Sequence, residues 1–190
     1  MVGLGHPLSP ACCVHGLDQV TSVGSDSQFF LFFFMKYQKF MTVTIRNAVP
    51  NDAATIAAFQ LAMALETEGK QLELGVVMPA VEEVFANPSR GFYLVGEIDG
   101  EVAGSLMVTY EWSDWRNSNL WYIQSVYVQE QFRGRGVFKN LYQTVIEQAR
   151  VEKAGHVRLY VESDNERAQK VYESLGMKRL PYFMYDIKVV

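Results

Sequence analysis

The stretch VYVQEQFRGRGVFKNL, residues 126–141, decides how the chain folds and what it can bind. It has the pattern of a buried strand, a short loop and the start of a helix. Gly134 and Gly136 lack the Cβ atoms that would hold a ligand away from the backbone. Their N–H groups would point outward at a helix N-terminus, which favours a phosphate or pyrophosphate group. The loop also carries three basic side chains, those of Arg133, Arg135 and Lys139.

This stretch also fits a plain strand-to-helix turn whose basic side chains are solvated. An isolated Gly-x-Gly more often indicates such a turn than a binding loop. Two familiar phosphate loops do not fit it. A dinucleotide fingerprint needs a third glycine where Lys139 stands, and a P-loop needs Gly-Lys followed by Ser or Thr. The surrounding sequence therefore has to decide between a binding loop and a plain turn.

Hydrophobic periodicity and capping residues predict an alternation of strands and helices around this stretch. The strongest local signal is Asp99-Gly100, which predicts a hairpin with a type I′ turn. The helix after Gly136 should end at Gly155, and its inward side carries Val137, Leu141, Val145, Ile146 and Ala149. The expected strands are Val43–Asn47, Gly91–Ile98, Glu101–Tyr110, Leu120–Val128 (buried on both faces), Val157–Glu162 and Phe183–Val189. The other expected helices run from Asn51 or Asp52 to about Glu66, from Pro79 to Ala86, and from Asn165 to Leu175 before Gly176.

Length and charge narrow the possible classes of protein. A chain of 190 residues fits one domain, and its net charge of -4 opposes nucleic-acid binding. Cys12 and Cys13 are adjacent, so they favour neither a disulfide framework nor a paired zinc site, and we expect a cytoplasmic protein. The apolar run Phe29–Met35 is too short to cross a membrane. We expect residues 1–40 to be a disordered extension outside the native protein, and residues 41–190 to be a single domain.

Two motifs resemble the GNAT family of acetyl-CoA-dependent N-acetyltransferases. Gln131-Phe-Arg-Gly134-Arg-Gly136 matches the family pattern of Arg or Gln, two residues, Gly, one residue, then Gly or Ala. Val157–Gly176 resembles the strand and helix that follow in the family, with Asn165 at the helix start and Tyr172 seven residues on. The resemblance covers about residues 42–189. It implies a mixed α/β fold with a largely antiparallel, twisted sheet of about six or seven strands, splayed at the cofactor site, and about four helices on both faces.

The resemblance also implies the roles of particular residues, with acetyl-CoA as cosubstrate. The backbone N–H of Val126 would polarise the thioester carbonyl, and Tyr172 would protonate the departing thiolate as general acid. Without the motif, Tyr172 would be a half-buried helix tyrosine, Val126 a core valine and Asn165 an N-cap. The ring of Phe138 must point away from the loop for the cofactor slot to stay open. The implied cofactor-binding residues are Val126, Tyr127, Val128, Arg133, Gly134, Arg135, Gly136, Val137, Phe138, Lys139, Asn165 and Tyr172.

The base that deprotonates the attacking amine stays unassigned. Many family members place a glutamate in the central strand, but residues 121–125 contain no carboxylate. Glu111 and Glu162 are candidates that would act through water, although a strand carboxylate is more often a solvated edge group. No metal site is expected, because the domain has no cysteine and His156 is its only histidine.

Acceptor specificity is expected between two strands, in Tyr110–Ser118, where aromatic and acidic residues alternate. This pattern suits a small cationic amine such as a polyamine, a lysine-like compound or an aminoglycoside, but it also fits a hairpin whose tryptophans cover the sheet. The candidate substrate residues are Glu111, Trp112, Asp114, Trp115 and Gln124. The alternatives are a protein N-terminal or lysine acetyltransferase and a catalytically silent acyl-CoA sensor. The expected partners are a small amine and possibly a second copy in a homodimer, with no nucleic acid and no membrane.

Overall fold

The computed structural model describes residues 42–189, so the expectations about residues 1–40 lie outside the described residues. Within this range, five strands form one sheet in the order β1-β2-β3-β4-β5. The first four strands pair antiparallel, and β4 and β5 pair parallel. The strands are β1 (Val43–Asn47), β2 (Phe92–Ile98), β3 (Glu101–Ser113), β4 (Ser118–Val128) and β5 (His156–Arg158).

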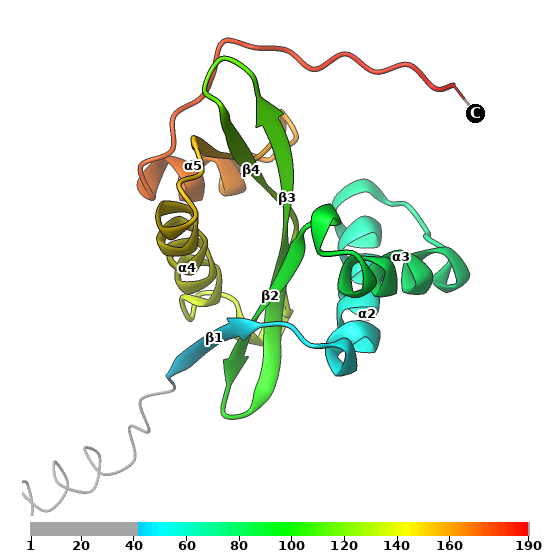
Figure 1. The fold of residues 1–190 in the computed structure, drawn as a ribbon. Coiled ribbons are helices and arrows are strands. Elements are labelled where there is room, and N and C mark those ends of the chain that lie inside the picture. Colours follow the sequence, from blue (N-terminus) through cyan, green and yellow to red (C-terminus); the bar gives the residue numbers. More distant parts are fainter. Residues whose placement is uncertain (1–41, 190) are drawn as a thin grey trace, which may run out of the picture. The chain divides into compact units, whose positions relative to one another are not determined.

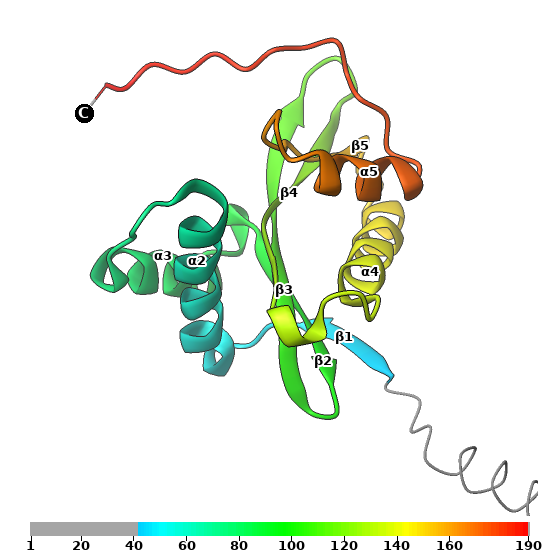
Figure 2. The ribbon, with the colours of Figure 1, turned by 180° about the vertical axis from the view of Figure 1, so that it is seen from behind.

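Four α-helices lie within the described residues, together with the short 3-10 helices η1 (Pro50–Asp52), η2 (Pro88–Arg90) and η3 (Glu130–Phe132). They are α2 (Ala53–Glu68), α3 (Leu74–Ala86), α4 (Val137–Val151) and α5 (Glu166–Ser174). Helices α2 and α3 cover one face of the sheet, and α4 and α5 lie against the other (Figure 1). Figure 2 shows the same two layers of helices from behind. None of the helices in residues 42–189 is long and apolar enough to cross a membrane.

Each face of the sheet carries its own hydrophobic core. The core under α4 contains residues of β2, β3 and β4 together with Leu141 and Val145 of the helix. The core under α2 and α3 contains Ile56, Val81 and Tyr93. Side chains on a strand alternate between the two faces, so successive residues of β3 enter different cores. Val108 packs under α4, whereas Met107 packs under α2 and α3.

Several sequence-based predictions are confirmed. The sheet is mixed and largely antiparallel, and strand β1 has the predicted bounds. Asp99 and Gly100 have φ values of 54° and 86°, as the predicted type I′ turn requires. Helix α4 buries Val137, Leu141, Val145 and Ala149, and Asn165 caps α5 by accepting a hydrogen bond from the N–H of Ala168. Ile146, which was also predicted on the inward side of this helix, is only half-buried.

The predicted bounds of two helices were wrong. Helix α3 begins at Leu74, and Pro79 lies inside it instead of at its start. In the first turn of α3, Leu74 and Val76 are apolar but exposed. The apolar residues of this turn therefore do not follow the buried face of the helix, and the sequence pattern could not reveal where the helix begins. Helix α4 ends at Val151 instead of Gly155. Gly155 instead allows the chain to pass close to β4, because a Cβ at this position would lie 2.5 Å from the Ser118 hydroxyl oxygen.

The predicted number of strands was also too high, because five strands lie in the described residues where six or seven were expected. Strand β5 stops at Arg158 instead of Glu162, and Phe183–Val189 forms no strand. Neither segment has a partner strand in the described residues that would take its backbone hydrogen bonds. Strand β4 is buried on both faces only near Leu120, Trp121 and Ile123, because its later residues lose β5 as a neighbour.

A small ionic cluster ties the start of the domain together. Asp52 is 7% exposed and accepts two hydrogen bonds from the Arg46 guanidinium, at 2.7 and 2.9 Å, and one from the Val49 N–H at 2.7 Å. Arg46 also donates to Glu97 at 2.8 Å. The hydrogen bonds from Arg46 hold the pKa of Asp52 below its ordinary value. The cluster therefore joins β1, β2 and the turn that leads into α2.

We expect Asp52→Asn to lower the free energy of unfolding at pH 7 by about 1–3 kcal/mol, because Arg46 loses the more buried of its two charged partners and keeps only Glu97. The folded pKa of Asp52 is lowered, so its contribution is complete above the ordinary value of 3.8 and disappears as the pH falls through the folded value. Urea unfolding at several pH values measures the difference. Glu82→Gln on the exposed side of α3 is the control, and equal stability of Asp52→Asn and the native protein at pH 7 would contradict the prediction.

Candidate functional site

Strand β4 contains a β-bulge in the middle of the sheet. Gly104 and Ser105 pair with Val128 and Tyr127, but from Met107 onward the register is shifted by one residue. Ser125 takes up the extra length with a φ of 50°, a conformation that few residues other than glycine adopt. The bulge lies one residue before Val126, so the strand is locally twisted where the sequence predicts the acyl group to lie.

The sheet opens beside this bulge. Strand β5 pairs with β4 only through Leu120, Trp121 and Tyr122, and within the described residues nothing pairs with Ile123–Val128 on that side. The side chains of Val126 and Val128 pack into the core under α4, as expected for core valines, whereas the Tyr127 ring packs on Phe59 of α2. One backbone edge of β4 is therefore open next to Val126, as the resemblance implies for a splayed sheet.

The glycine loop follows β4 and leads into α4. Gly134 and Gly136 have φ values of 76° and 82°, so glycine is needed at both positions. A Cβ at Gly134 would meet no atom within 4 Å, and at Gly136 only the Asn140 side chain. Within residues 42–189, no acceptor takes the N–H groups of Gly134, Gly136 or Val137. These amides face open space at the positive end of a helix dipole, which is a suitable place for an anion.

The basic residues of the loop differ in what they contact. Arg133 donates from Nε to the Val128 carbonyl at 2.9 Å and from NH2 to Glu66 at 2.6 Å, and its pKa is raised by the bond to Glu66. Arg133 therefore fastens the loop to β4 and α2. The Arg135 guanidinium lies 5.5 Å from the Phe132 ring centroid, whereas Lys139 is exposed on the first turn of α4.

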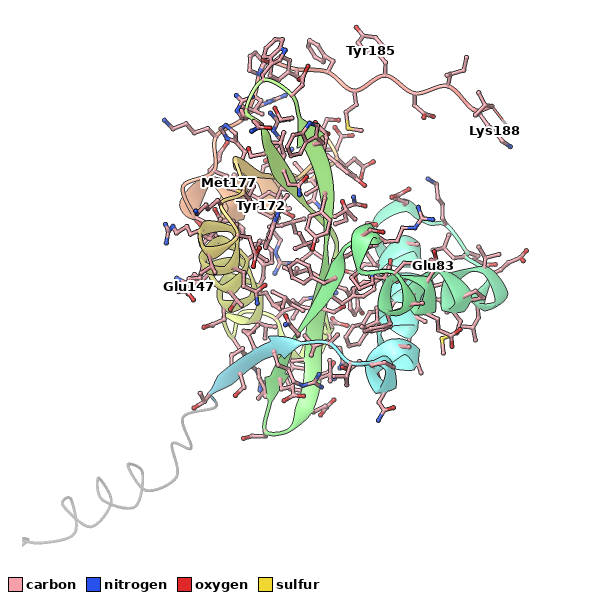
Figure 3. The ribbon with its side chains drawn as sticks, viewed as in Figure 1. Glu83, Glu147, Tyr172, Met177, Tyr185 and Lys188 are labelled. Atoms are coloured by element: carbon pink, nitrogen blue, oxygen red, sulfur yellow. The ribbon has the colours of Figure 1, made fainter. Side chains whose placement is uncertain are left out.

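Tyr172 of α5 lies against the first turn of α4. Its ring meets the Phe138 ring edge to face at 5.6 Å, and Phe138 also contacts Tyr142. Figure 3 shows Tyr172 on the side of α5 that faces the rest of the domain. Burial raises the pKa of the Tyr172 hydroxyl above its ordinary value of 10.0. The Phe138 ring points to α5 and leaves the space at Gly134 open, as the sequence analysis requires for an accessible loop.

A row of polar side chains runs from the bulge toward the β3–β4 turn, on the face opposite α4. Gln124 donates to the Thr109 hydroxyl at 2.5 Å, and Arg158 donates to the Tyr122 hydroxyl at 3.3 Å. Arg158 also lies 3.9 Å from the Glu111 carboxylate. The alternation of β3 and β4 places these side chains on one face, so they line one path along the open part of the sheet.

The candidate substrate residues lie in two places. Glu111, Trp112, Asp114 and Trp115 line one pocket of about 310 Å³ together with Arg158. Gln124 is not in this pocket and lies at the other end of the polar row. Trp112 and Trp115 are 61% and 90% exposed, so they do not cover the sheet as the alternative interpretation requires.

Sequence analysis missed a second pocket, of about 830 Å³, on the α4 face of the sheet. Its aromatic walls come from three different strands, so no local motif could have revealed them. Glu147 and Glu152 near the end of α4 add acidic side chains, and burial and Glu152 raise the pKa of Tyr110. The aromatic residues that line it are Phe92, Tyr110, Trp112 and Trp121.

Comparisons with known proteins agree with this geometry. A model of the acetyltransferase (GNAT) family matches residues 59–177, well over half of the chain. Thialysine N-epsilon-acetyltransferase of Bos taurus is 33% identical over 95 residues, which are 46% of this chain and 55% of that protein. The Sus scrofa protein of the same name is 34% identical over a stretch of the same length. The chain thus spans about half the length of the curated relatives it matches.

Solved structures extend the similarity over the whole described domain. A possible acetyltransferase from Clostridium difficile 630 is 40% identical, with a TM-score of 0.73, over 78% of this chain and 98% of that one. A predicted acetyltransferase from Clostridium acetobutylicum, solved with acetyl-CoA, has a TM-score of 0.64 over 77% of this chain and 96% of that one. Its identity is 14%, so it shows the fold alone.

We expect Gly136→Ala to weaken binding of coenzyme A at least tenfold, because a Cβ would stand in front of the loop amides and strain a left-handed residue. Isothermal titration measures the affinity. The matched control is Gly69→Ala, which alters a glycine with a φ of 62° and equally open surroundings at the end of α2. Both variants should lose similar stability, so an equal loss of affinity in the two would contradict a binding role for the loop.

Proposed function

The chain belongs to the acetyltransferase (GNAT) family, and on that premise we propose that it transfers the acetyl group of acetyl-CoA to the primary amine of a small cationic molecule. The proposal rests on one observation, which is that the glycine loop and the open edge of β4 lie next to each other along the chain. The N–H groups of Gly134 and Gly136, which have no acceptor within residues 42–189, follow β4 after the short helix η3, and the edge of β4 is open next to Val126. An anion and a peptide-like chain attached to it could therefore be held side by side.

These residues fit the parts of acetyl-CoA. The amides of Gly134, Gly136 and Val137 would hold the diphosphate, with positive charge from Arg135 and Lys139. The backbone groups of Val126 and the N–H of Val128 would hydrogen-bond the amide groups of the pantetheine arm, much as an added strand would, whereas the Val128 carbonyl already accepts from Arg133. Asn165 uses its Oδ1 to cap α5, so its amide nitrogen would be the group that donates to the ligand.

Acetyl-CoA supplies an electrophilic carbonyl carbon and a thiolate leaving group. The N–H of Val126 would donate a hydrogen bond to the carbonyl oxygen, in the position that the bulge at Ser125 gives it. As the amine nitrogen bonds to the carbonyl carbon and the C–S bond breaks, Tyr172 would donate its proton to the departing sulfur. The amine would lose a proton to water, and that proton would restore the Tyr172 hydroxyl. Because burial raises the pKa of Tyr172, its hydroxyl stays protonated at neutral pH and is able to act as the acid.

The amine would approach along the polar row on the opposite face. Gln124 and Thr109 lie near the bulge, and Glu111 lies at the far end beside exposed tryptophans. A carboxylate next to aromatic rings attracts a cation through charge and cation–π contact. Glu111 would therefore hold a positive group of the acceptor and raise its concentration at the site. The names of the curated relatives, which are amine N-acetyltransferases, support the same class of substrate.

The proposal is tested by incubating the protein with acetyl-CoA and a panel of diamines, polyamines, lysine analogues and peptides, and by following the release of free CoA thiol. Turnover with small cationic amines supports it. Turnover with peptides alone would identify a protein acetyltransferase instead. Binding of acetyl-CoA without turnover on any member of the panel would identify a sensor.

We expect Tyr172→Phe to lower kcat by about 10²-fold or more with little change in the KM for acetyl-CoA, because general acid catalysis typically contributes that much. The matched control is Tyr142→Phe, since Tyr142 also contacts Phe138 but lies on α4. Steady-state kinetics with the best amine measure both variants. A Tyr172→Phe enzyme with native kcat would exclude the hydroxyl as the acid.

We expect Glu111→Gln to raise the KM for the amine about 2- to 5-fold and to leave the KM for acetyl-CoA unchanged, because an exposed ion pair contributes up to about 1 kcal/mol. Glu147→Gln serves as the comparison, since Glu147 lines the larger pocket on the opposite face (Figure 3). If Glu147→Gln raised the KM and Glu111→Gln did not, the acceptor would enter through the α4 face and the proposed path would be wrong.

A further inference from the structure

The pocket of about 830 Å³ on the α4 face of the sheet has no part in the proposed reaction. Its volume is typical of pockets that hold small molecules. Two walls of different chemistry enclose it. Strands β2, β3 and β4 supply an aromatic wall, and the end of α4 supplies an acidic one.

Three rings form the inner part of the aromatic wall. Trp121 meets Phe92 at a centroid distance of 5.3 Å and an angle of 73°, and it meets Tyr110 at 5.9 Å and 61°. Rings that meet at such angles form a corner and not a flat surface. The outer part of the wall is open, since Tyr110 is 37% exposed and Trp112 is 61% exposed. Ring faces in such a hollow attract cations, because the face of an aromatic ring carries partial negative charge.

The acidic wall carries two carboxylates, those of Glu147 and Glu152. Within residues 42–189, neither of them forms an ion pair. Both lie at the C-terminal end of α4, where the helix dipole is negative and a basic side chain is the favourable choice. Among the described residues that line the pocket, Lys153 is the one with a cationic side chain. Two carboxylates against one ammonium leave an excess of negative charge, which a bound cation would balance.

The two walls act on each other across the pocket. Burial and the charge of Glu152 raise the pKa of Tyr110 above its ordinary value. The negative charge of Glu152 therefore reaches the Tyr110 ring. A cation between them would interact with a carboxylate on one side and with a ring face on the other, and both interactions favour ammonium groups.

The aromatic wall favours a weakly hydrated cation. A primary ammonium loses hydrogen bonds from its N–H groups when it leaves water, and ring faces replace them poorly. A quaternary nitrogen has no N–H group, so it loses less when it enters the corner between Tyr110 and Trp121. Such a nitrogen also has no lone pair that could attack a thioester. The ligand of this pocket would therefore not be an acceptor of the acetyl group.

We propose that the pocket on the α4 face binds a quaternary ammonium ion, at a site separate from the smaller pocket beside Glu111. The cation would lie against the rings of Tyr110 and Trp121, and Glu147 and Glu152 would balance its charge. This inference rests on the pocket alone and needs no assumption about the reaction that the domain catalyses.

The first test measures the binding of choline to the full chain by isothermal titration. The comparison ligand is 3,3-dimethyl-1-butanol, which has the shape of choline but a carbon atom in place of the charged nitrogen. We expect choline to bind at least about fivefold more tightly than this alcohol, because cation–π contact and charge both favour it. Equal affinity for the two ligands, or no binding of choline at millimolar concentrations, would overturn the inference.

The second test locates the bound choline with variants. Trp112 lines both pockets, so the variants change Tyr110 and Glu152, which line only the larger one. We expect Tyr110→Leu to weaken choline binding about 3- to 10-fold, because it keeps an apolar side chain but removes the ring face. Glu152→Gln should weaken binding about 2- to 5-fold, and since Glu152 is exposed, this variant keeps the fold even if Tyr110→Leu does not.

The matched control is Glu111→Gln, which removes the same charge from the smaller pocket. It should leave the affinity for choline unchanged. If Glu111→Gln weakened choline binding and Glu152→Gln did not, choline would occupy the smaller pocket and the inference would be wrong. Absence of acetyl transfer to any amine would contradict the proposed function and leave this binding result unaffected.

Discussion

The end of pairing between β4 and β5 at Tyr122 is the constraint on which the site depends. Parallel neighbours in a sheet normally satisfy each other's backbone groups along their whole length. Here the pairing stops where β4 also bulges at Ser125, so the backbone around Val126 faces a gap instead of a strand. The backbone groups of β4 on this side, next to Val126, form no hydrogen bonds to a neighbouring strand within the described residues. They are therefore available to a ligand. The gap lies next to the glycine loop because β4 continues into it.

A second requirement is that the loop after β4 keeps one shape without a ligand. Arg133 meets this need by joining the Val128 carbonyl to Glu66 of α2. Gly104 contributes from β3, because a Cβ there would lie 2.6 Å from the Tyr127 carbonyl oxygen and would push β4 away at the bulge. The shape of the loop thus rests on contacts with α2 and on the close approach of β3 to β4. Such preorganisation limits the entropy lost on binding.

Sequence reasoning succeeded where local rules act and failed where distant partners decide. The hairpin at Asp99-Gly100, the buried side of α4 and the cap at Asn165 follow from nearest neighbours, and the structure has all three. The motif also marked Gly134 and Gly136, which both have positive φ values, while the binding role of their amides stays a prediction. It could not show that Arg133 is engaged with Glu66, because 67 residues separate the two. The aromatic pocket on the α4 face likewise depends on residues from three separate strands, which periodicity does not bring together.

Helix α5 is the least anchored part of the domain, and it carries Tyr172. None of its residues is buried, and its ring contact with α4 is the one between Tyr172 and Phe138. Elements with so few buried contacts open at a free energy well below that of global unfolding. Displacement of this one helix would widen the slot beside β4 while both cores stay packed. One side of the slot can therefore move by itself, while the sheet on the other side keeps its hydrogen bonds and its two cores.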